Sequence, residues 1–306
     1  MNIRSIPADL TAGRQIIVHV SDSACGPRPL AIVSHGTGGN RFAYATLGRH
    51  LAAAGYVVVH PTHAGSDDAA MKLAPGRRID RIRALMADAN IWRSRAADIR
   101  AVIDAVGTHP VLRERVDPSR VGVVGHSYGA HTAMTIGGML VVPQRGDAIG
   151  HSGQRGCAES LRDARVRAVA ALSPPSVGRL GIEPGAWREM TTPLLVMTGT
   201  LDAELDIGDY SKRRIAYDES RGPACYVLID GADHLTFADY APAGNRSKPP
   251  DPRHVFWVHR ACEMFFNGYV CDDSAALDWM TRHRLQVESA GICTVEHHGA
   301  LTTPNP

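Results

Sequence analysis

The sequence lacks the features that mark a disulfide-stabilised, membrane-spanning or nucleic-acid-binding protein. Its 306 residues include six cysteines, too few for a disulfide scaffold, and no two have the C-x-x-C spacing of a zinc or redox site. No run of about 18 apolar residues occurs, so no membrane-spanning helix is expected. The 33 basic and 31 acidic residues give a net charge of +2, which provides no field to attract nucleic acid.

The N-terminal residues also lack the apolar segment of a signal peptide. We therefore expect a cytoplasmic protein, although a secreted protein whose leader had been removed would have the same sequence. Cys262 lies on an apolar helical stripe and is expected in the core. Cys271 and Cys293 could form a disulfide if the protein is exported, and the sequence leaves this open. It also leaves the oligomeric state open.

Short β-branched segments alternate with longer helical patterns, which predicts an α/β protein with a mostly parallel central sheet flanked by helices. No linker and no repeat of about 20–50 residues divides the chain, so residues 1–306 are expected to form a single domain. Two irregular inserts, 143–156 and 240–253, and a C-terminal tail from about residue 281 are expected. Strands are expected at 15–20, 30–34, 56–60, 120–124, 167–172, 193–198 and 225–229, and helices around 44–54, 92–106, 130–140 and 255–265.

The motif G-H-S-Y-G occupies residues 125–129, directly after the apolar segment 121–124 and before an apolar helix of small residues. A serine that attacks a carbonyl carbon has to project from a sharp strand-to-helix turn, in a strained backbone conformation. The residues two before and two after it then come close together, which explains glycine at both places. Ser127 is therefore the candidate nucleophile. The alternative is a turn whose serine only caps the helix.

A nucleophilic serine needs a histidine as base and a carboxylate that orients the histidine. Asp202 follows the apolar segment 194–198, at the end of an expected strand where ligands bind in open α/β sheets. Asp206 is the rival acid, and a plain turn aspartate is the other alternative. His234 follows the last expected strand and is the candidate base, whereas the adjacent Asp233 is expected to anchor its loop.

A glycine-rich loop, S-H-G-T-G-G at residues 34–39, follows the expected strand 30–34. Such a loop can present a backbone N–H to a carbonyl oxygen, and the residue after the nucleophile supplies a second N–H. Thr37 and Tyr128 are therefore the expected oxyanion donors. The alternative is a simple strand-to-helix turn.

Two other clusters have less specific interpretations. The segment H-P-T-H at residues 60–63, with aspartates at 67 and 68, contains metal-binding residue types. Its proline breaks a helix and its spacing fits no zinc template, so we expect a pocket-lining loop and no metal or cofactor. The arginines at 77, 78, 81 and 83 are expected on a solvated helix face, with contact to an anionic ligand as the alternative.

Together these segments resemble the dienelactone-hydrolase-like esterases, and within that group the platelet-activating-factor acetylhydrolases and the polyester-cleaving cutinases. The resemblance covers roughly residues 12–270 and rests on segments 34–39, 60–67, 92–106, 121–129, 199–202 and 231–234. It implies the alpha/beta-hydrolase fold and ester hydrolysis without a cofactor, with Ser127, Asp202 and His234 as nucleophile, acid and base. Dienelactone hydrolases proper use a cysteine nucleophile, so lactone opening is not implied. The inserts and the residues after about 272 match none of these families.

The sequence therefore predicts a serine hydrolase that cleaves small or polymeric carboxylic esters through an acyl-enzyme. An amidase, a peptidase or a thioesterase would use the same three residues, and a ligand-binding protein could share the fold without activity. The sequence does not indicate the natural substrate or the sizes of its acyl and alcohol groups.

Overall fold

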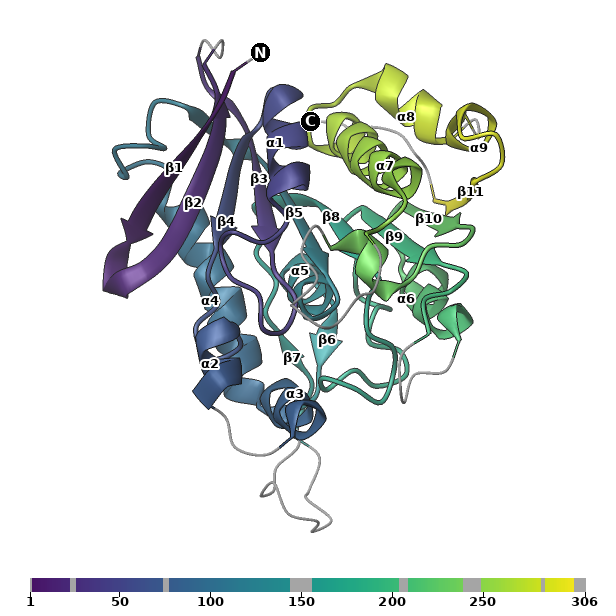
Figure 1. Cartoon of the computed structure of the whole chain (residues 1–306), viewed down its shortest axis with the longest axis horizontal. Coiled ribbons are helices and arrows are strands. Elements are labelled where there is room, and N and C mark those ends of the chain that lie inside the picture. Colours follow the sequence, from purple (N-terminus) through teal and green to yellow (C-terminus); the bar gives the residue numbers. More distant parts are fainter. Residues whose placement is uncertain are drawn as a thin grey trace.

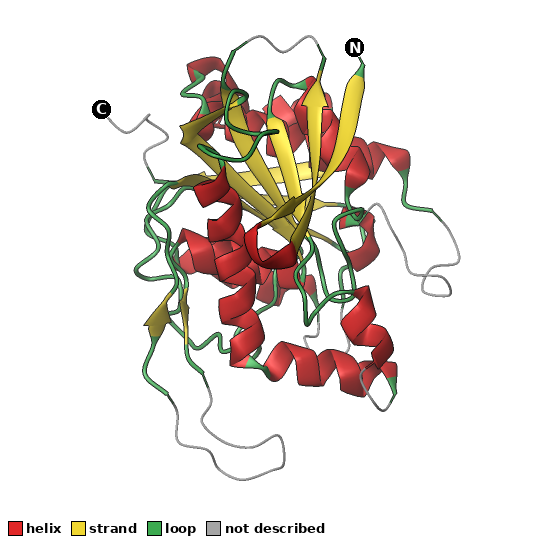
Figure 2. Ribbon diagram, turned by 90° about the vertical axis from the view of Figure 1, so that its left-hand side faces the viewer, coloured by secondary structure: helices red, strands yellow, loops and turns green. Residues whose placement is uncertain are grey.

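The computed structural model describes residues 2–22, 26–73, 77–143, 156–203, 209–238, 249–281 and 284–299. These residues form a central nine-stranded sheet with helices on both faces (Figures 1 and 2). In their order across the sheet the strands are β1 (Ile3–Leu10), β2 (Arg14–Ser21), β4 (Val57–Pro61), β3 (Arg28–Ser34), β5 (Val116–His126), β8 (Val166–Leu172), β9 (Leu194–Gly199), β10 (Ala224–Ile229) and β11 (Cys293–His298).

The central strands, from β4 to β10, pair in parallel. Strands β2 and β1 are added antiparallel at one side and β11 at the other. Because parallel strands end at the same edge of a sheet, the loops that follow β3, β5, β9 and β10 meet there. This mostly parallel sheet between helices is an alpha/beta-hydrolase fold, as the sequence predicted.

Helices cover both faces because successive side chains of a strand point to opposite sides. In β3, Leu30 and Ile32 enter one hydrophobic cluster, together with α4, α5 and α6, whereas Ala31 and Val33 enter the other, together with α1, α7 and α8. The helices are α1 (Ala45–Ala53), α2 (Asp68–Leu73), α3 (Arg78–Ala87), α4 (Ala89–Ala105), α5 (Tyr128–Gly137), α6 (Ile215–Glu219), α7 (Pro252–Val270), α8 (Ser274–Thr281) and α9 (Arg284–Glu288). Short elements complete the description: the hairpin strands β6 (Leu140–Val141) and β7 (Glu159–Ser160), and the 3₁₀ turns η1 (Thr11–Gly13), η2 (Tyr210–Arg214) and η3 (His234–Phe237).

The long helix α4 shows how the sequence pattern determines burial. Ile99, Val102 and Ile103 are buried on the face predicted from their helical spacing. Burying one such side chain stabilises a protein by about 1.5–3 kcal/mol. The helix begins after Asp88, whose carboxylate accepts the N–H of Asn90 at 2.8 Å. These interactions hold α4 against the sheet, close to the candidate site.

All seven expected strands and four expected helices are present. In the segment expected as a C-terminal tail from about residue 281, residues 284–288 form α9 and residues 293–298 form the sheet strand β11. Strand β11 buries Cys293 and Val295 and exposes Thr294 and Glu296, an alternation too short to stand out in the sequence. The N-terminal strand β1 was not expected either.

The two expected inserts lie partly outside the described residues. Insert 143–156 is described only at its two ends, and insert 240–253 only from residue 249. Cys262 is buried, as predicted, and both Cys271 and Cys293 are free thiols. None of the described helices combines the length and the apolar character needed to cross a bilayer. The single-domain organisation stays a prediction.

Candidate active site

Ser127 occupies the turn between β5 and α5, with φ 56° and ψ −117°. A non-glycine residue in such a sparsely populated conformation costs about 1–3 kcal/mol. Two glycines make the turn possible. A methyl group on Gly125 would overlap the carbonyl of Gly129, and one on Gly129 would overlap the carbonyl of Ser34. The packing therefore confirms why glycine stands two residues before and two after Ser127.

Asp202 lies in the loop after β9 and His234 in the loop after β10, and their side chains meet. The Nδ1 atom of His234 is 3.1 Å from Oδ1 of Asp202. The Asp202 side chain has no exposed surface, and its Oδ2 accepts the hydroxyl of Thr198 at 2.8 Å. The structure thus brings together the carboxylate and the imidazole that the sequence predicted as acid and base.

Two side chains that the sequence analysis missed surround this pair. Nη2 of Arg213 is 2.9 Å from Oδ1 of Asp202, and neither side chain has exposed surface. Ser173 has the left-handed φ of 46°, and its Oγ is 2.6 Å from Nδ1 of His234. Burial acts to raise the pKa of Asp202, but the hydrogen bond with His234 and the charges of His234 and Arg213 outweigh it. The net pKa lies well below the ordinary value, so the carboxylate is ionised at neutral pH.

His126, the residue before Ser127, connects three loops of the site. Its Nε2 is 2.9 Å from the carbonyl oxygen of His234, and because a carbonyl only accepts, Nε2 carries the proton. Its Nδ1 therefore accepts the Tyr44 hydroxyl at 2.8 Å, and the Tyr44 oxygen accepts the N–H of Gly36 at 3.3 Å. Burial lowers the pKa of His126 well below the ordinary value, which agrees with this neutral tautomer. These bonds fix the glycine-rich loop and the His234 loop relative to Ser127.

The two expected oxyanion donors belong to segments that adjoin Ser127. Tyr128 is the first residue of α5, where N–H groups have no partner within the helix and the helix dipole is positive. Thr37 follows Gly36, at which an added Cβ would lie 3.6 Å from Cβ of Ser127. Among the hydrogen bonds of the described residues, neither the Thr37 nor the Tyr128 N–H is a donor. Thr37 and Tyr128 thus stay the expected oxyanion donors.

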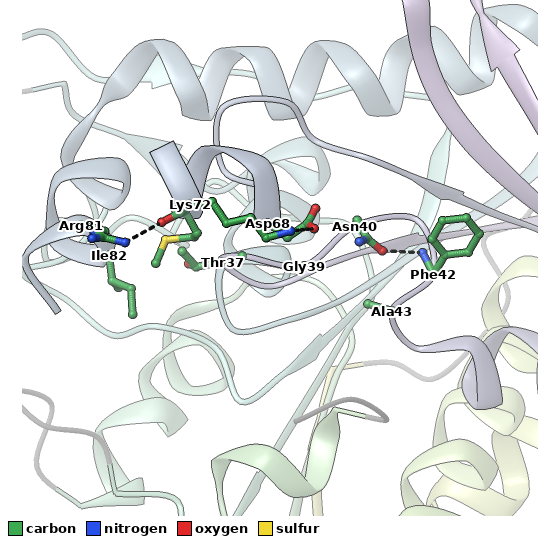
Figure 3. Close-up of a pocket in the computed structure, with 11 residues that line it drawn as sticks. Thr37, Gly39, Asn40, Phe42, Ala43, Asp68, Lys72, Arg81 and Ile82 are labelled. Carbon is green, nitrogen blue, oxygen red and sulfur yellow. Dashed lines mark hydrogen bonds and ion pairs between the residues drawn. The ribbon is translucent and has the colours of Figure 1, made fainter. Parts of the chain in front are cut away.

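A pocket of about 500 Å³ opens beside Thr37, between the loop at residues 37–43 and helices α2 and α3. Figure 3 shows Thr37 between the Arg81 end of the pocket and the Phe42 end. Phe42, Met71 and Ile82 provide apolar lining. Arg81, expected on a solvated helix face, is partly exposed, lines the pocket and donates to the carbonyl of Met71 at 3.1 Å.

The remaining sequence candidates have other surroundings. In the part of the chain that the structure describes, no three metal-ligating side chains form a group. His60 hydrogen bonds through Nδ1 to the carbonyl of Ala43 at 3.0 Å. Asp233 caps the turn η3 by accepting the N–H of Thr236 at 2.8 Å. Asp206, the rival acid, lies outside the described residues.

Comparison with known proteins gives one family match and no match among curated proteins. Residues 20–74 match the family model of platelet-activating factor acetylhydrolase, isoform II. The matched segment includes β3, the loop with Thr37, β4 and α2, and it ends before Ser127. At the level of that family the match supports a hydrolase that acts on esters. The chain thus has an alpha/beta-hydrolase fold and, over residues 20–74, is similar to the platelet-activating factor acetylhydrolases.

Proposed function

We propose that the protein is a serine hydrolase that cleaves carboxylic esters through an acyl-enzyme intermediate. The observation that carries the proposal is the contact between Asp202 and His234 at 3.1 Å, in a fold that holds Ser127 in a strained strand-to-helix turn. The backbone of His234 is hydrogen-bonded to the residue before Ser127, so this pair belongs to the same edge as the serine. The family match supports the ester hydrolase class independently of these contacts.

In the proposed cycle, His234 accepts the hydroxyl proton of Ser127 while Oγ attacks the ester carbonyl carbon. The N–H groups of Thr37 and Tyr128 stabilise the oxyanion, and losing one such donor typically lowers kcat by about 10²–10³. His234 then protonates the leaving alcohol. A water molecule that gives its proton to His234 attacks the acyl-enzyme, and the collapse of this second tetrahedral intermediate restores Ser127. Asp202, ionised throughout, stabilises the imidazolium.

We assign the pocket beside Thr37 to the acyl chain of the ester. A carbonyl oxygen bound at the Thr37 N–H leaves one arm of the substrate next to the pocket mouth, and a volume of about 500 Å³ is typical of small-molecule sites. The apolar lining of Phe42, Met71 and Ile82 favours an aliphatic chain over a charged one.

Chain-length profiles test this assignment. We expect Ile82→Trp, which fills the pocket, to shift the preferred p-nitrophenyl ester toward shorter acyl chains across a series from acetate to palmitate. Leu73→Trp is the matched control, because Leu73 lies on the neighbouring helix and is 85% exposed. An identical profile in wild type and Ile82→Trp would remove the acyl chain from this pocket.

The function itself is tested by Ser127→Ala. We expect turnover of p-nitrophenyl acetate to fall to the background rate, with unchanged circular dichroism and melting temperature. Full residual activity would remove Ser127 from the mechanism. Matched ester, anilide and thioester substrates then separate an esterase from an amidase or a thioesterase.

A further inference from the structure

Helix α4 carries a guanidinium that the proposed cycle does not use. Arg95 has no exposed surface, and its Cζ lies 4.3 Å from the ring centroid of Tyr128. Burial lowers the pKa of Arg95 to about 10, so the group is cationic at neutral pH. A buried charge is costly unless hydrogen bonds compensate its lost hydration. The hydrogen-bond partners of Arg95 therefore indicate which segments this charge holds in place.

Those partners belong to three separate segments next to the candidate site. Nε donates to the hydroxyl of Thr132 on α5 at 2.7 Å, and Nη1 donates to the hydroxyl of Ser66 at 2.7 Å. Nη2 donates to the hydroxyl of Ser34 at 3.2 Å and to the carbonyl of His35. Arg95 thus joins the helix that begins at the nucleophile to the loop that carries Thr37.

The ring of His35 continues this connection toward Thr37. Its Nε2 is 2.9 Å from the backbone nitrogen of His63 and accepts that N–H, so the ring proton is on Nδ1. Nδ1 donates to the carbonyl of Gly36 at 2.7 Å. This carbonyl belongs to the peptide unit that carries the N–H of Thr37. Because N–H and C=O point in opposite directions in a trans peptide, fixing the oxygen also fixes the direction of the N–H.

A second imidazole supports the first from the other side. Nδ1 of His63 donates to Oδ2 of Asp98 at 2.9 Å, and its Nε2 accepts the hydroxyl of Ser34 at 2.9 Å. Oδ1 of Asp98 accepts Nε of Arg14 at 2.8 Å. Donors and acceptors alternate consistently along this chain with both imidazoles neutral, and burial lowers the pKa of each well below the ordinary value. The network thus fixes the orientation of the His35 backbone and ring.

We propose that Arg95, acting through His35, is a positioning residue that holds the Gly36–Thr37 peptide with its N–H directed at the developing oxyanion. This inference rests on the proposed function. It assigns a role to two sequence motifs, 60–67 and 92–106, that the proposed cycle leaves unused. A misdirected donor weakens binding of the transition state and leaves binding of the ground-state ester almost unchanged.

The test compares Arg95→Met with Arg100→Met, a matched control on the same helix whose guanidinium bonds to carbonyls of Leu161 and Arg162. For Arg95→Met we expect kcat with p-nitrophenyl acetate to fall at least about tenfold while KM changes less than about threefold. Affinity for a trifluoromethyl ketone, whose hemiketal oxyanion mimics the transition state, should fall in proportion to kcat/KM. Arg100→Met should retain kcat even where its melting temperature falls equally.

A second variant keeps the test decisive if Arg95→Met does not fold. His35→Phe retains Arg95 and a ring of similar size but removes both imidazole bonds, and the same fall in kcat and in ketone affinity is expected. A kcat within threefold of wild type in folded His35→Phe, or a rise in KM with kcat retained, overturns the proposal. Activity of Ser127→Ala separates the two failures, because a fully active Ser127→Ala removes the proposed function as well.

Discussion

Replacing Asp202 with asparagine removes the negative charge that faces Arg213 in a fully buried position. The two side chains have no exposed surface, and their closest atoms are 2.9 Å apart. Removing one partner of a buried ion pair typically destabilises a protein by about 3–5 kcal/mol, because the remaining charge is unpaired. Arg213 also donates to the carbonyls of Ser173 and Pro174, at 3.3 and 2.7 Å. We therefore expect a loss at the lower end, about 3 kcal/mol in the free energy of unfolding.

The same substitution affects the proposed base. An orienting aspartate contributes about 10⁴ in kcat where it is the only acceptor for the histidine N–H. Here Ser173 Oγ lies 2.6 Å from the same nitrogen and remains as an acceptor. We therefore expect Asp202→Asn to lower kcat by a smaller factor, about 10³.

Urea unfolding at pH 7 and p-nitrophenyl acetate kinetics separate these two effects. The double variant Asp202→Asn/Arg213→Met has no unpaired buried charge, so its free energy of unfolding should recover toward wild type while kcat stays low. Arg213→Met alone is the matched control. The reasoning would be contradicted if Asp202→Asn lowered the free energy of unfolding by less than about 1 kcal/mol. It would also be contradicted if the loss in the double variant equalled the sum of the losses in the two single variants.

Three further predictions concern the surroundings of the site. Tyr44→Phe removes the hydroxyl that connects the glycine-rich loop to His126, and kcat should fall about tenfold; an unchanged kcat would contradict this bridge. Gly129→Ala places a methyl group against backbone, and urea unfolding should show a loss of more than about 3 kcal/mol; a loss below about 0.5 kcal/mol would mean that the turn between β5 and α5 has room for the methyl group. Burial lowers the pKa of His60 and His131 to about 3, so both gain a proton only on unfolding between pH 6.5 and about 3. In this range the unfolded state binds more protons than the folded state, so the free energy of unfolding decreases as the pH is lowered. These two groups should make the protein about 4 kcal/mol less stable at pH 5 than at pH 7, and a constant free energy of unfolding over that range would refute their neutral state.

The interior of the sheet could be predicted because strands buried on both faces appear as continuous apolar segments. Strand β3 is of this kind, with all but its first residue buried. The edge strand β1 buries only Leu10 and contains Pro7 and Asp9, so its sequence has no strand signature. Edge strands form because a neighbour supplies hydrogen-bond partners, and this information lies elsewhere in the chain.

The candidate nucleophile, acid and base could be predicted because each lies at, or in the loop after, the end of a recognisable strand. Arg95 and Arg213 could not, since their roles depend on partners distant in sequence: His35 is 60 positions from Arg95, and Ser173 is 40 from Arg213. One feature of the sequence indicates that Arg95 is paired in the interior. Arg95 stands four residues before Ile99 on the apolar stripe of α4, and a charged residue on a buried face is expected only where it is paired.

Covalent labelling tests the central claim most directly. After reaction with a fluorophosphonate and proteolysis, mass spectrometry should find the phosphonyl group on the peptide that contains Ser127, with one equivalent bound per chain. Labelling should fail in His234→Ala, which lacks the proposed base. A label on Ser173, whose hydroxyl also contacts His234, or no label on a folded protein, would contradict the account.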